Sequence, residues 1–153
     1  MDINTRPADP KIMNKTIHIN APTSQVWQML TTPELMKKWM MSDIDIEIIT
    51  DWKVGGPFEI HGTMNGKYFE NKGTVLQFEP ERALQYSHLS SLSRLPDRPE
   101  NHAVVAFHLQ PIGDQTTLTL TLSNFATESI YKHLAFYWNV TPEVLKQMIE
   151  TAA

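Results

Sequence analysis

The 153-residue sequence contains no cysteine, and this absence removes several classes of site at once. Without thiols the chain can form no disulfide, no zinc–thiolate centre and no thiol nucleophile. Basic residues are also few, since 13 Lys and Arg stand against 17 Asp and Glu, for a net charge of −4. Nucleic acids and anionic membrane surfaces attract proteins of the opposite balance, so we expect neither as a partner.

Long hydrophobic runs are missing as well. No apolar stretch approaches the ~20 residues that a helix needs to cross a bilayer, and residues 1–10 lack the apolar core of a signal peptide. We therefore expect no membrane insertion and a cytoplasmic location. Apolar residues make up 41% and charged residues 20%, which is typical of a globular protein. The prediction is a flexible tail over residues 1–10 and a single domain over residues 11–153.

The C-terminal stretch carries the clearest helical signal. From Glu128 to about Thr151, apolar side chains recur at the spacing that places them on one helical stripe. The stripe consists of Ile130, Leu134, Tyr137, Trp138, Leu145, Met148 and Ile149. Pro142 interrupts this pattern. A proline inside a helix removes one hydrogen bond and collides with the preceding turn, so we predict a kink or a break near residues 139–141.

The region before this helix alternates apolar and polar residues, as strands do. The predicted strands span residues 11–20, 45–51, 58–61, 68–78, 83–89, 103–110 and 116–124. Two short helices fall between the first two strands, and Pro33 marks the first turn of the second one. Consecutive strands with short turns form a meander, and such a sheet curls around a helix lying across it. The predicted fold is therefore α+β, a curved antiparallel sheet of about six to seven strands wrapped around the long C-terminal helix.

Recognisable catalytic motifs are missing. None of the six histidines forms an HxH or HExxH pattern, so solvated or singly hydrogen-bonded histidines are the favoured interpretation. The serines include no Gly-x-Ser-x-Gly elbow. Residues 62–67 have one residue too few between the glycines for a phosphate loop, and the Asn65–Gly66 pair favours a hairpin. We expect no metal and no cofactor, and the sequence inclines against an enzyme without excluding one.

A cavity between a curved sheet and one helix would be lined by aromatic side chains and a few polar groups, as small-molecule sites usually are. Tyr86 and His88 alternate with Leu84 along one strand, so both enter the cavity if that strand face points inward. The competing interpretation is that the aromatic residues only pack in the core. The predicted ligand-binding residues are Trp39, Tyr86, His88, Phe107, Tyr137 and Trp138.

Several spaced segments resemble one known family. They are residues 17–39, residues 54–58, Gly73 to Leu76 with Glu79–Pro80, residues 96–101, and Trp138 with Leu145 and Lys146. Together they resemble the START-like (SRPBCC, helix-grip) superfamily, and more narrowly the bacterial homologues of the activator of heat shock protein 90 ATPase. The resemblance implies a curved sheet that grips the C-terminal helix over a ligand-sized cavity. Pro142 departs from the family pattern, which usually has an aliphatic residue there.

Three functions compete at this stage. The first is binding of a small apolar or amphipathic ligand, without catalysis, in the implied cavity. The second, implied by the resemblance alone, is a co-chaperone-like interaction domain with a chaperone as partner. The third is a cyclase- or hydrolase-like enzyme that uses Tyr86 and His88 for proton transfer. The sequence also leaves open whether the chain forms a homodimer.

Overall fold

The computed structural model of the chain describes residues 11–41 and 44–152, so the predicted tail at residues 1–10 lies outside the described residues. The elements, in order, are β1 (Met13–Ile19), α1 (Thr23–Thr31), α2 (Pro33–Trp39), β2 (Ile46–Thr50), β3 (Pro57–Met64), β4 (Lys67–Glu79), β5 (Ala83–Ser90), the 3₁₀ turns η1 (Ser91–Ser93) and η2 (Pro99–Asn101), β6 (Ala103–Ile112), β7 (Gln115–Ser123) and α3 (Glu128–Thr151). In the described part of the chain, no helix combines the length and the hydropathy of a membrane span.

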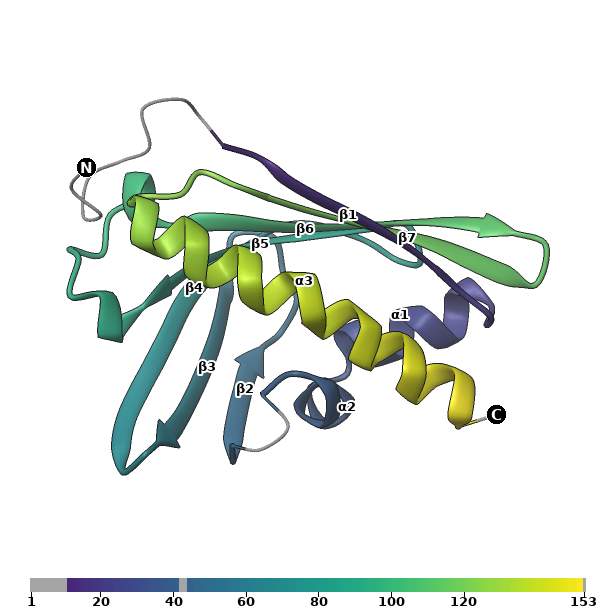
Figure 1. Cartoon of the computed structure of the whole chain (residues 1–153), viewed down its shortest axis with the longest axis horizontal. Helices are drawn as coiled ribbons and strands as arrows, with labels where there is room; N and C mark the ends of the chain where they lie inside the picture. Colours follow the sequence, from purple (N-terminus) through teal and green to yellow (C-terminus); the bar gives the residue numbers. More distant parts are fainter. Residues whose placement is uncertain (1–10, 42–43, 153) are drawn as a thin grey trace.

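The strands form one seven-stranded antiparallel sheet in the order β1-β7-β6-β5-β4-β3-β2. Strands β2 to β7 follow one another as a meander, and β1 returns to pair with β7 at the far edge. In Figure 1, α3 crosses the sheet, and α1 and α2 lie near the C-terminal half of α3. The predicted α+β helix-grip architecture is confirmed, including the two short helices between the first two strands.

Local sequence explains the strands and their turns. Along β7, Leu118, Leu120 and Leu122 are at most 1% exposed, and threonines alternate with them on the other face. Asn65 and Gly66 connect β3 to β4 with φ angles of 52° and 77°. Positive φ at both central residues is the geometry of a type I′ turn, which matches the twist of a hairpin.

The pairing of β4 with β5 is interrupted around Gly73. The ladder runs from Asn71↔Ser90 to Lys72↔Leu89 and resumes only at Val75↔Tyr86, followed by a register shift. The backbone of Ser87 lies so close that a Cβ on Gly73 would be 1.7 Å from the Ser87 carbonyl oxygen. Such irregularities bend a strand. Figure 1 shows the consequence, because the β3–β4 hairpin projects away from the plane of β6 and β7.

Helix α3 buries the predicted stripe. Leu134, Trp138, Leu145 and Ile149 are at most 6% exposed and face the core. The helix runs as one element through Pro142, so the predicted break does not occur, and a kink stays a prediction. Pro142 has no N–H to donate to the carbonyl of Trp138, four residues earlier. Two other donors bind the carbonyls on either side of Trp138. The Thr141 hydroxyl donates to the Tyr137 carbonyl at 2.8 Å, and Lys15 Nζ donates to the Asn139 carbonyl at 2.7 Å.

The C-terminal half of α3 is also tied to the end of β1. Lys146 Nζ donates to the His18 carbonyl and to the Glu150 carboxylate, both at 2.6 Å. The Glu150 carboxylate also accepts the Asn20 backbone N–H at 2.8 Å, and these contacts hold the Glu150 pKa below its usual value. The helix therefore has a fixed position on the edge of the sheet at this end.

Candidate functional site

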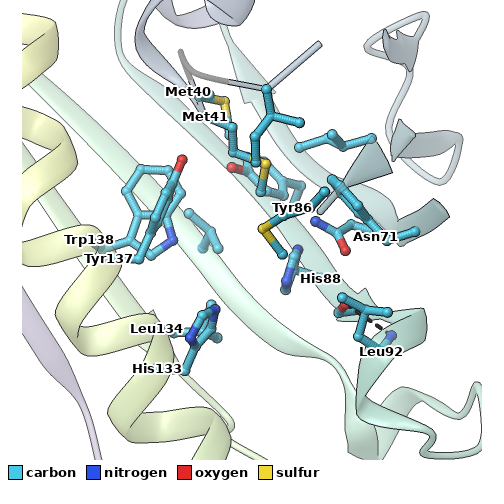
Figure 2. Close-up of a pocket in the computed structure, with 16 residues that line it drawn as sticks. Met40, Met41, Asn71, Tyr86, His88, Leu92, His133, Leu134, Tyr137 and Trp138 are labelled. Atoms are coloured by element: carbon cyan, nitrogen blue, oxygen red, sulfur yellow. Dashed lines mark hydrogen bonds between the residues drawn. The ribbon is translucent and has the colours of Figure 1, made fainter. Parts of the chain in front are cut away.

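A pocket of about 320 Å³ lies between the inner face of β3–β6 and the N-terminal half of α3. Figure 2 shows side chains of α3 on one side, with Asn71, Tyr86 and His88 facing them from the sheet. The segment after α2 closes a third side with two methionines. The lining residues are Met40, Met41, Ile44, Ile60, Met64, Phe69, Asn71, Tyr86, His88, Ser90, Leu92, Val105, His133, Leu134, Tyr137 and Trp138.

The lining is largely apolar and carries no permanent charge. Methionine, leucine, isoleucine and aromatic side chains dominate, and none of the described lining residues is Lys, Arg, Asp or Glu. Polar groups are few and come from an amide, two imidazoles and hydroxyls. Pockets for small molecules typically hold roughly 300–1,000 Å³ and combine apolar walls with a few polar groups. This pocket has both properties.

Four of the six residues predicted from the sequence line the pocket, namely Tyr86, His88, Tyr137 and Trp138. The other two, Trp39 and Phe107, lie in the layer behind it and are each 3% exposed. The Trp39 indole donates to the Met29 carbonyl at 2.8 Å.

Both of these buried rings pack edge-on against Trp138. The ring centroid of Trp39 lies 6.3 Å from that of Trp138, and the centroid of Phe107 lies 5.7 Å from it. Trp39 and Phe107 therefore support a residue of the pocket wall without belonging to the wall.

The ionisable groups that project from β5 stay uncharged at neutral pH. Burial, with smaller contributions from the neighbouring His102 and His133, lowers the pKa of His88 to about 4. Burial also raises the pKa of Tyr86, with a smaller contribution from Tyr137. The β5 side of the pocket therefore offers one neutral imidazole and one neutral phenol at pH 7, which can exchange hydrogen bonds but cannot neutralise a charged ligand.

Asn71 of β4 is the polar residue that the sequence analysis missed. Its side chain is 5% exposed, and its Oδ1 has no hydrogen-bond partner among the described residues. Phe69, Asn71 and Val75 lie on the buried face of β4. This pattern could have identified Asn71, because burying a polar group costs free energy unless it forms a hydrogen bond. Asn71 pairs with Ser90, so His88, two residues before Ser90, is its diagonal neighbour on the same face.

A long segment connects β5 to β6, and only its beginning lies at the pocket. Leu92 of η1 lines the pocket and is 38% exposed. The later part is held by its own contacts. Asn101 Nδ2 donates to the Pro96 carbonyl at 2.9 Å, and His102 Nε2 lies 2.6 Å from Asp97 Oδ1. The family-like segment at residues 96–101 therefore has a structural role.

The histidines do not converge on a metal. Within residues 11–41 and 44–152, no three His, Cys, Asp or Glu side chains come together as a metal-binding set. His61 pairs with Glu59 at 2.8 Å and His18 with Thr117 at 3.1 Å, each outside the pocket.

A seven-stranded antiparallel sheet that grips a long C-terminal helix, with a pocket between the two, is the architecture of a START-like domain. The family model described as "Activator of Hsp90 ATPase homolog 1-like protein" matches residues 20–150. The chain belongs to this family.

Solved structures with the same fold cover nearly the whole chain. The solution structure of ChR145 from Cytophaga hutchinsonii is 38% identical, with a TM-score of 0.79, and the match covers 94% of this chain and 97% of that one. The Aha1 dimer from Colwellia psychrerythraea is 25% identical with a TM-score of 0.68, over 92% and 96% of the two chains. Protein MLL2253 from Mesorhizobium loti, 24% identical with a TM-score of 0.74 over 94% and 99%, shares the fold. No curated protein matches the chain by sequence.

Proposed function

We propose that this chain binds a small apolar or amphipathic molecule in the pocket between the sheet and α3. The observation that carries the proposal is the unfilled space of about 320 Å³ beside Tyr137 and Trp138. Protein interiors pack as densely as organic crystals and leave few voids larger than a water molecule. An apolar space of this size next to a well-packed aromatic layer is therefore better explained by a ligand than by imperfect packing.

Native mass spectrometry of the freshly purified chain tests this directly. We expect an adduct that is absent from the denatured mass, and its mass would identify the class of ligand.

A variant tests the location of the site. His88→Trp fills part of the pocket and should abolish both the adduct and the thermal stabilisation by added apolar compounds. The matched control is His108→Trp, because His108 is exposed on the outer face of β6. Equal binding by the two variants would contradict the pocket as the site.

A second candidate function is supported by the family description and by the relative whose structure is named an Aha1 dimer. On this proposal the chain contacts an Hsp90-type chaperone and raises its ATPase rate. The test is the steady-state ATPase rate of the bacterial chaperone with increasing amounts of the chain. An unchanged rate, together with no complex in a pull-down, would remove this candidate.

The dimeric Colwellia relative also supports the proposal that this chain forms a homodimer. Sedimentation velocity at micromolar concentrations should then give a species of twice the 17.5 kDa chain mass. A single species at the monomer mass across that range would contradict it.

A further inference from the structure

We infer that the occupant of the pocket is an uncharged molecule with an apolar body and a hydroxyl group that hydrogen-bonds to the side-chain amide of Asn71. This inference rests on the proposed ligand-binding function and adds the chemical class of the ligand. It is carried by the burial of Asn71, by its unpartnered oxygen and by the absence of charge in the described lining.

The Asn71 amide is the feature that the fold alone leaves unexplained. Roughly 90% or more of buried polar groups in proteins have a hydrogen-bond partner, because leaving one without a partner costs stability. Asn71 is 5% exposed, and no described residue donates to its Oδ1. Because the side chain lines the pocket, a ligand can supply the missing donor.

The neighbours of Asn71 do not satisfy it. Ser90, its partner in the strand pairing, accepts the Leu92 backbone N–H at 3.2 Å, and its hydroxyl makes no hydrogen bond to Asn71 Oδ1. His88, the diagonal neighbour, makes none of the hydrogen bonds found among the described residues and also faces the pocket. The polar end of the pocket therefore consists of an amide and a neutral imidazole side by side on β4 and β5.

The absence of charged residues from the described lining also narrows the chemical class of the ligand. A buried charge without a counter-ion is strongly unfavourable, and the described lining contains no Lys, Arg, Asp or Glu. His88 cannot serve as the cation at neutral pH because burial lowers its pKa to about 4. A carboxylate or ammonium group should therefore be rejected, whereas a hydroxyl can donate to Oδ1 of Asn71 and also accept from its Nδ2.

The rest of the pocket accommodates the apolar body. Trp138 and Leu134 present apolar surface from α3, and Met40 and Met41 present flexible thioethers from the third side of the pocket. Methionine adapts to irregular shapes and packs well against aromatic rings. A planar ring system with one hydroxyl matches this arrangement of an apolar cleft with one polar end.

Three probes that share one ring system test the inference, namely 2-naphthol, 2-methoxynaphthalene and 2-naphthoate. Isothermal titration at pH 7 should rank 2-naphthol first, about tenfold tighter than 2-methoxynaphthalene, because the ether cannot donate to Asn71. The anion 2-naphthoate should bind most weakly. This ranking needs no variant and so does not depend on whether a substituted chain folds.

A variant assigns the preference to Asn71. In Asn71→Leu the affinities for 2-naphthol and 2-methoxynaphthalene should become nearly equal, while 2-methoxynaphthalene still binds. The matched control is Asn139→Leu, at an exposed position of α3 outside the pocket lining, and it should keep the tenfold preference. Circular dichroism of both variants verifies the fold.

The outcomes separate this inference from the proposed function. Equal binding of 2-naphthol and 2-methoxynaphthalene by the natural chain would overturn the hydroxyl assignment and leave ligand binding intact. Tightest binding of 2-naphthoate would overturn the assignment of an uncharged ligand. If none of the three probes binds and the native mass also shows no adduct, the proposed function fails and this inference fails with it.

Discussion

His88 links the pocket to pH at the scale of a single residue. Burial lowers the pKa of its ring from 6.5 to about 4, so the unfolded chain takes up this proton first as the pH falls. Protonation therefore favours the unfolded state between pH 6.5 and 4, and stability is lost as the pH decreases through that window. We expect this one group to remove about 2 kcal/mol of the free energy of unfolding between pH 7 and 4.5.

Urea denaturation at the two pH values measures this contribution. In His88→Gln the loss of stability on acidification should be smaller than in the natural chain by the same ~2 kcal/mol. His108→Gln serves as the control, because His108 is exposed on the outer face of β6. If all three chains lose the same free energy, His88 is not the group that titrates.

The sequence identified part of the pocket for a clear physical reason. Alternation along β5 placed Tyr86 and His88 on the inner face, and helical spacing placed Tyr137 and Trp138 on the side of α3 that faces the sheet. Trp39 could not be assigned in the same way, since only the tertiary contact with Trp138 decides whether it lines the pocket or supports it.

Gly73 determines the local shape of the sheet at the scale of secondary structure elements. A Cβ at this position would lie 1.7 Å from the Ser87 carbonyl oxygen, so the backbones of β4 and β5 would have to separate. We expect Gly73→Ala to destabilise the chain by about 3 kcal/mol and to lower the Tm by roughly 10 °C. Differential scanning calorimetry measures both quantities.

Gly66→Ala is the matched control for this substitution. Gly66 has a φ of 77° but nothing within 4 Å of an added Cβ, so only the cost of a left-handed alanine applies. That cost is about 1 kcal/mol. If Gly73→Ala were as mild as Gly66→Ala, the close approach of the two strands would not be a constraint on the fold.

Whole helices and strands were easier to predict from the sequence than the effect of a residue that interrupts their pattern. The strong alternation of β7 and the single apolar stripe of α3 left little choice of structure. Pro142 shows the limit, because intrinsic preference predicts a kink or a break, while the structure keeps one helix and adds donors from Thr141 and Lys15 nearby. The donor from Lys15 belongs to a strand more than one hundred residues away, and no local pattern could reveal it.

One chain of aromatic contacts crosses the whole molecule. Successive ring centroids lie 4.0 to 6.5 Å apart, from the connection between β2 and β3 through the centre of the sheet to α3 and α2. Its members are Trp52, Phe58, Tyr86, Phe107, Trp138 and Trp39. Because these rings come from elements far apart in the sequence, the loss of one ring removes contacts from the elements next to it in space, and the core is linked from one end to the other.

This continuity predicts that residues 11–152 unfold as one cooperative unit. Tryptophan fluorescence reports on all four tryptophans, of which Trp27, Trp39 and Trp138 are each at most 8% exposed, and far-ultraviolet circular dichroism reports on the sheet and α3. In urea the two signals should give the same midpoint, and a calorimetric trace should show one peak whose van't Hoff and calorimetric enthalpies agree. A fluorescence midpoint below that of circular dichroism would show that the aromatic core opens first. The proposal of a single domain would then give way to a sheet and a helix that separate before they unfold.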